Sequence, residues 1–192
     1  MTPRVCYALC SLVALWAFGG GDAQLFWNRQ WLLAPLVLAA GFVGIFLTGQ
    51  IEKLFASTEH VKKGLMIGLI SALPFVALIF MAHKSAGLPD WIITSINNSK
   101  VPSFLGVFLG AFLLAPGWEL VSRGLLQPVW GLGSVAFLDA ITIGFGSQTL
   151  LPFAVLWAMG LFWGWIRVRF SLHSAVLAHV TWSFLVLSML AL

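Results

Sequence analysis

Glu119 and Arg123 are the residues most able to do chemistry, because they place a carboxylate and a guanidinium inside a strongly apolar stretch. They are four residues apart, about one helical turn, so both side chains project from the same face. A charge at the centre of a membrane costs about 2.5–3.5 kcal/mol on insertion scales, and such residues are usually functional. Pro116 lacks an N–H and crowds the carbonyl one turn earlier, so we expect a kink just before Glu119. The sequence therefore predicts a polar site between helices.

A few other polar side chains lie at comparable depth in apolar segments. They are Asp139, Gln148, Thr149, His173, His179 and Ser183. Counting inward from the helix ends at 1.5 Å per residue places Glu119 and His179 in the same layer, about 12 Å deep, with Ser183 one turn beyond. This predicts a cluster of Glu119, His179 and Ser183 beside Arg123. The alternative is that Glu119 and Arg123 form an ion pair that only joins helices, with His179 hydrogen-bonded across the bundle.

The elements that position these residues must be membrane-spanning helices. The chain is 60% hydrophobic and 8% charged, with a mean hydropathy of +1.00, which leaves too few charges to cover a water-soluble domain. Apolar runs of about 20 residues, the length that crosses a ~30 Å hydrocarbon core, recur along it. The sequence predicts an all-α, polytopic transmembrane bundle of about seven spans. The net charge of +4 comes from scattered loop residues, so the lipid bilayer is an expected partner and nucleic acid is not.

The predicted spans divide the chain into two parts. Residues 1–102 hold three spans and an interfacial segment, and residues 103–192 hold a core of four spans. The spans cover about residues 5–19, 31–50, 64–82, 103–127, 135–150, 152–169 and 171–192. The first run also resembles a signal peptide, with small residues before a possible cleavage point. Small residues four apart, such as Gly64 with Gly68 and Gly160 with Gly164, predict close helix contacts within the bundle.

Basic residues predict the orientation. An N-terminus inside the cell places most of the lysines and arginines on the cytoplasmic side, as the positive-inside rule requires. These residues are Arg4, Lys53, Lys62, Lys63, Arg167 and Arg169. The expected location is therefore an integral protein of the cytoplasmic membrane.

Two segments resemble a known family. Residues 115–126, with Glu119, Arg123 and Gly124, resemble the motif EExxxRG of the CAAX-protease and bacteriocin-processing (CPBP) glutamic intramembrane endopeptidases. Residues 160–179 resemble that family's approach to its last motif, HxxxN. The resemblance implies a hydrolase, an endopeptidase that cleaves a membrane-associated or lipidated peptide or protein. It equates Glu119 with the second glutamate, Arg123 with the arginine and His179 with the last histidine.

The sequence departs from the family pattern at three positions. Trp118 stands where the family has its first glutamate, which is thought to activate the attacking water. Thr149, or Gln148 in a shifted register, stands at the middle histidine of FxxxH, and Ser183 stands at the final asparagine. Threonine and serine can hydrogen-bond but cannot accept a proton as histidine does. Glu119 is then the carboxylate left to act as the general base.

Other functions fit the same residues. A catalytically lapsed relative would use the pocket to bind a membrane partner, and a small-solute carrier would use Glu119 and Arg123 for permeation, although no inverted repeat supports a carrier. A dyad of Ser147 with His179 is disfavoured by its sequence context. A metal held by Glu119, His173 and His179 is disfavoured because the two histidines point in directions about 240° apart. The sequence predicts neither a cofactor nor a metal.

Overall fold

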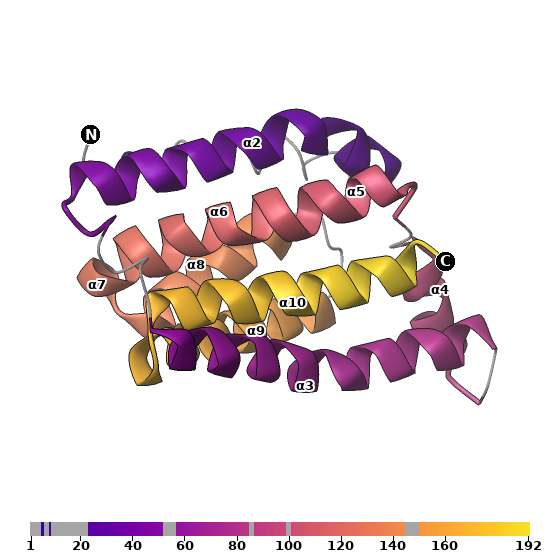
Figure 1. The fold of residues 1–192 in the computed structure, drawn as a ribbon. Helices are drawn as coiled ribbons and strands as arrows, with labels where there is room; N and C mark the ends of the chain where they lie inside the picture. Colours follow the sequence, from indigo (N-terminus) through magenta and orange to yellow (C-terminus); the bar gives the residue numbers. More distant parts are fainter. Residues whose placement is uncertain are drawn as a thin grey trace.

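The chain folds into a bundle of helices whose long axes run roughly side by side (Figure 1). The computed structural model describes residues 5, 8, 23–51, 57–84, 87–98, 101–144 and 150–192. Every regular element in this part of the chain is helical, which confirms the predicted all-α class. The elements are α2 (Ala23–Leu47), α3 (Thr58–His83), α4 (Asp90–Asn98), α5 (Phe104–Phe108), η2 (Leu109–Leu114), α6 (Ala115–Glu119), η3 (Leu120–Leu126), α7 (Gln127–Trp130), α8 (Leu132–Gly144), α9 (Leu150–Arg169) and α10 (Leu172–Leu190).

The described residues contain four helices long and apolar enough to cross a membrane. They cover Trp27–Leu47, Thr58–His83, Phe104–Trp130 and Leu172–Leu190. The chain therefore has the build of an integral membrane protein.

The prediction of about seven spans was wrong, because an apolar run in the sequence is not always a spanning helix. The predicted first span, at 5–19, lies outside the described residues except for two positions. Of the predicted fifth span, 135–150, the structure describes 135–144 and 150; the first of these parts lies in α8, whose 13 described residues measure about 20 Å. The predicted sixth is α9, which ends on Arg167 and Arg169 and whose first side chains are not described.

The central helix runs without a break from Phe104 to Trp130, although it contains two prolines. A π-helical segment, η2, lies just before Pro116, where the Ala115 N–H bonds to the Gly110 carbonyl, and the kink expected there stays a prediction. A second π-helical segment, η3, ends in the same way just before Pro128. Proline in a regular helix crowds the carbonyl four residues back and leaves it without a donor. The wider π turns relieve that crowding, and π segments often mark functional sites.

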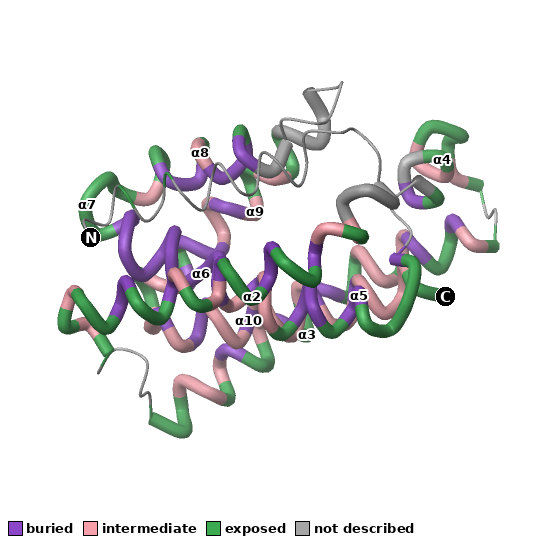
Figure 2. The backbone as a smooth tube through the Cα atoms, turned by 90° about the horizontal axis from the view of Figure 1, so that it is seen from above, coloured by how far each residue is buried: buried purple, intermediate pink, exposed green. Residues whose placement is uncertain are grey.

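The central helix is also the most deeply buried part of the bundle. Residues 117–127 are all buried, whereas α2 and α3 each expose a broad face (Figure 2). Gly117 allows this close packing, because a methyl group there would lie 2.5 Å from the Leu38 backbone nitrogen of α2. The chain therefore places its polar side chains on the helix that the other helices surround.

Glycines also allow α3 and α10 to pack closely. A methyl group at Gly64 would lie 2.8 Å from the Ser174 carbonyl oxygen, and one at Gly68 would lie 2.5 Å from the Ala178 oxygen. The Ser174 hydroxyl donates to the His60 carbonyl at 3.0 Å. The prediction that these small residues serve packing inside the bundle is confirmed. Helices on both sides of the predicted boundary at residue 102 thus pack together, and the division into two parts stays a prediction.

Basic residues gather at one end of the bundle. The start of α3, which carries Lys62 and Lys63, lies at the same end as the turn between α9 and α10, at the left of Figure 1. Arg167 and Arg169 occupy the last turn of α9 at that end. The positive-inside rule assigns such an end to the cytoplasm. The orientation with the N-terminus inside stays a prediction.

Candidate functional site

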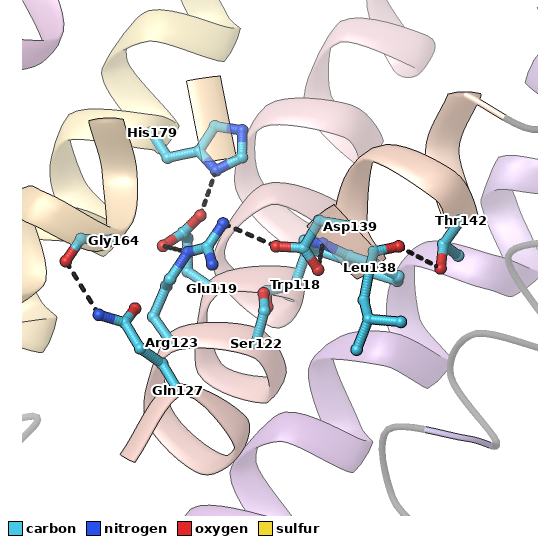
Figure 3. Close-up of polar contacts among 10 residues, drawn as sticks. All are labelled: Trp118, Glu119, Ser122, Arg123, Gln127, Leu138, Asp139, Thr142, Gly164 and His179. Atoms are coloured by element: carbon cyan, nitrogen blue, oxygen red, sulfur yellow. Dashed lines mark hydrogen bonds and ion pairs between the residues drawn. The ribbon is translucent and has the colours of Figure 1, made fainter. Parts of the chain in front are cut away.

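Three helices bring ionisable side chains together at the centre of the bundle (Figure 3). Glu119 and Arg123 come from the central helix, Asp139 from α8 and His179 from α10. Glu119 is fully buried, Arg123 is 1% exposed and Asp139 is 4% exposed. With a neutral histidine, two carboxylates and one guanidinium leave a net charge of −1. So many charges at this depth are costly unless each is paired, so their pairing decides what the site can do.

Arg123 is bound mainly by Asp139. Its Nη2 donates to Asp139 Oδ2 at 2.6 Å, whereas its Nε lies 3.8 Å from Glu119 Oε2. The second distance is within ion-pair range but too long for a hydrogen bond. The guanidinium thus lies between two carboxylates and is hydrogen-bonded to the one on the neighbouring helix.

Trp118 holds the other side of Asp139. Its indole Nε1 donates to Asp139 Oδ1 at 3.1 Å, and the ring is 5% exposed. Both oxygens of Asp139 are therefore engaged, one by the indole and one by Arg123. The residue that stands at the family's first glutamate is here a hydrogen-bond donor to a carboxylate from another helix.

Glu119 is joined to α10 through His179. The His179 Nδ1 lies 2.9 Å from Glu119 Oε1, and the imidazole is 19% exposed. The Trp163 ring of α9 stacks on the imidazole, with ring centroids 4.9 Å apart and planes 11° apart. A flat stack of this kind fixes the orientation of the imidazole, so Nδ1 stays directed at the carboxylate.

A cavity of about 130 Å³ adjoins these side chains. Glu119, Arg123, Asp139 and His179 form its polar part. Its remaining lining is apolar and aromatic: Phe75, Trp118, Val155, Leu156, Met159, Gly160, Trp163 and Trp182. The cavity is large enough to admit water together with a small polar group of a ligand.

Several buried polar atoms around the cavity have no hydrogen-bond partner among the described residues. They are Glu119 Oε2, Arg123 Nε, Arg123 Nη1 and Trp182 Nε1. One acceptor and three donors are therefore left in residues that line a single cavity. A buried polar group without a partner costs about 1–3 kcal/mol, so such a group requires an explanation. The set matches a ligand that offers both a donor and an acceptor.

The structure brings together some of the predicted site residues but not all of them. Glu119, Arg123 and His179 meet at the cavity. Ser183 is buried on α10 but is not among the residues that line the cavity. Thr149 lies outside the described residues, as do the alternative Gln148 and the Ser147 of the disfavoured dyad. Within the described ranges, no group of three potential ligands lies close enough to hold a metal ion.

Sequence reasoning missed the roles of Asp139 and Trp163. Asp139 is the one acidic residue of its apolar segment, and that signal marked it as a candidate without giving it a partner. Trp163 is one of ten tryptophans, and nothing in the sequence distinguishes it from those expected to face lipid. Their positions became apparent only from the packing of α8 and α9 against the central helix.

No protein-family model, curated protein or solved structure matches this chain. The resemblance to the CPBP endopeptidases therefore remains a hypothesis supported by residues 115–126 and 160–179.

Proposed function

We propose that this chain is an intramembrane endopeptidase, a divergent relative of the CPBP family, in which Glu119 activates water within the buried cavity. The observation that carries the proposal is the set of unpartnered atoms on Glu119 and Arg123, two residues that line the same cavity. A peptide bond under attack by water supplies both kinds of group that these atoms need: a proton donor and an oxygen acceptor.

Glu119 Oε2 is the atom suited to act as the general base. It has no hydrogen-bond donor among the described residues, whereas Oε1 is held by His179 at 2.9 Å. A general base must be within hydrogen-bond reach of the proton that it takes. A water donating to Oε2 is positioned by a carboxylate whose orientation His179 fixes. Asp139 is a poorer base, because both of its oxygens already accept hydrogen bonds.

Arg123 is the group suited to stabilise the oxyanion. Its Nε and Nη1 are buried donors with no partner in the described chain, and its Nη2 is anchored by Asp139. Donors fixed in advance where negative charge develops are usually the largest single contribution to acyl-transfer catalysis. In this reaction the water oxygen bonds to the carbonyl carbon while its proton passes to Glu119. Glu119 then protonates the amine as the C–N bond breaks.

The surroundings favour a substrate segment that enters from the bilayer. Three of the helices that line the cavity, α3, the central helix and α10, are apolar enough to span a membrane, and most of the lining is aliphatic or aromatic. An apolar segment of a membrane-associated peptide or protein can bury its side chains against this lining without leaving charges unpaired. The substrate class is therefore an apolar peptide at or within the membrane.

The test is cleavage of a library of single-span peptides by the purified protein in lipid vesicles, read by mass spectrometry. Glu119→Gln keeps the size of the side chain but removes the base, so cleavage should fall by about 10²–10⁴-fold. Products formed equally by both proteins would exclude Glu119 as the base. If peptides bind equally to both proteins and neither cleaves them, the lapsed, partner-binding alternative is favoured.

A further inference from the structure

Trp118 is the feature that most separates this site from the family that it resembles, and its contacts give it a role. The indole N–H is bonded to Asp139 Oδ1 at 3.1 Å, and the other oxygen of Asp139 binds Arg123 at 2.6 Å. All three side chains are at least 95% buried. They form a continuous chain of hydrogen bonds from the central helix to α8 and back (Figure 3).

We propose that Trp118 and Asp139 are positioning residues that hold the Arg123 guanidinium away from Glu119, which leaves Glu119 Oε2 able to accept a proton. The inference rests on the proposed function for its catalytic consequence, but not for its structural part. We call Trp118, Asp139 and Arg123 the clamp.

Arg123 lies within reach of two carboxylates, those of Glu119 and Asp139. Glu119 is on the same helix, four residues earlier, in the order that favours pairing with Arg123. The guanidinium nevertheless bonds to Asp139 and stays 3.8 Å from Glu119 Oε2. Because Trp118 fixes the other oxygen of Asp139, that carboxylate is oriented for the guanidinium.

The consequence appears when the clamp is removed. A buried guanidinium without a counter-charge is strongly destabilising, so Arg123 would turn to the next carboxylate. That carboxylate is Glu119, whose Oε2 lies 3.8 Å from Arg123 Nε. If this distance shortened to a hydrogen bond, the guanidinium would occupy the oxygen assigned as the base. The donors assigned to the oxyanion would move at the same time, and a displacement of about 1 Å can cost about 10² in rate.

The test uses Asp139→Asn and Trp118→Phe in the full-length protein, because the first removes the counter-charge and the second removes the indole donor together with part of the buried ring. Thr142→Val is the matched control: Thr142 lies one turn along α8, is 5% exposed, and its hydroxyl donates to the Leu138 carbonyl of its own helix. With a peptide that the natural protein cleaves, Asp139→Asn should lower kcat by about 10²-fold with little change in KM. Trp118→Phe should lower it less, and Thr142→Val should leave it unchanged.

A measurement that needs no turnover accompanies the first. The thermal midpoint is followed by tryptophan fluorescence for Glu119→Gln, Asp139→Asn and the double variant. If Arg123 turns to Glu119 when Asp139 is neutralised, Glu119→Gln should lower the midpoint by about 2 °C or more beyond its effect in the natural protein. Additive effects would mean that the guanidinium does not exchange partners. If Asp139→Asn does not fold, the same cycle with Trp118→Phe decides.

The outcomes separate the two proposals. Cleavage that depends on Glu119 but is unaffected by Asp139→Asn and Trp118→Phe, with additive midpoints, overturns the clamp and leaves the proposed function standing. No cleavage by the natural protein, together with non-additive midpoints, overturns the proposed function and supports the structural part of the clamp. A fall in kcat matched by an equal fall for Thr142→Val would show general damage to α8 and would also overturn the clamp.

Discussion

Placing a glutamate at position 118 is the substitution for which the family resemblance and the observed contacts predict the most different results. The family motif begins with two glutamates, so by resemblance alone Trp118→Glu should repair the enzyme. The structure leads to the opposite expectation. The indole nitrogen lies 3.1 Å from Asp139 Oδ1, so a glutamate at this position would direct a second buried carboxylate at the first.

The size of the effect follows from that proximity. Two unit charges about 4 Å apart repel by about 4 kcal/mol at an effective dielectric constant of about 20. Arg123 does not cancel this repulsion fully, because it is already hydrogen-bonded to Asp139. At about 2–4 °C per kcal/mol for a chain of this length, Trp118→Glu should melt about 8–16 °C below Trp118→Gln, which loses the same ring without adding a charge.

Thermal melts in detergent, followed by tryptophan fluorescence, measure this difference directly. Trp118→Gln is the matched control, since it has the shape of glutamate without the charge and its amide can still donate to Asp139. The double variant Trp118→Glu with Asp139→Asn should melt above Trp118→Glu alone, although Asp139→Asn lowers the midpoint of the natural protein. The reasoning is refuted if Trp118→Glu melts at or above Trp118→Gln, or if Asp139→Asn lowers both backgrounds equally.

Two further predictions concern the helices that hold the site. Gly117→Ala should lower the thermal midpoint by several degrees, because its methyl group would lie 2.5 Å from the Leu38 backbone nitrogen and overpacking costs about 1–3 kcal/mol. Gly133→Ala is the control, because a methyl group there would meet nothing within 4 Å. An equal effect of both substitutions would contradict the close approach at Gly117. Trp163→Leu should lower kcat, because the His179 imidazole stacks on the Trp163 ring at 4.9 Å and would lose its fixed orientation. Trp163→Phe keeps an aromatic ring and should retain most activity. Equal rates for the two variants would show that the stack does not contribute to activity.

The class of the fold and the meeting of Glu119 with His179 could be predicted because both depend on local sequence. Apolar composition determines that the chain forms spanning helices, and counting 1.5 Å per residue brought Glu119 and His179 to one layer. The glycine pairs on α3 predicted a close helix contact correctly, because a missing side chain permits close approach wherever the partner lies.

The contacts of Asp139 could not be predicted, because they depend on which face each helix turns to its neighbours. Asp139 binds Arg123 and Trp118 because α8 packs beside the central helix in one rotation, and no local pattern specifies that rotation. The number of spans was overestimated because apolar composition alone does not fix the length of a helix; the described residues contain four helices long and apolar enough to span a membrane. The π-helical segment just before Pro116 is likewise a feature that sequence rules rarely predict.

The two π-helical segments also change which residue faces the site. A regular helix advances about 100° per residue, so a widened turn that absorbs one residue puts all later residues out of phase with an unbroken helix by that angle. Glu119 is the last residue of α6, which follows η2 directly, and the angle equals the difference in direction between positions 118 and 119. A comparison that counts residues along the helix without a gap would therefore align Trp118 with the face that Glu119 occupies. Relatives of this chain are best sought by matching helix faces, with a one-residue gap allowed between 109 and 114.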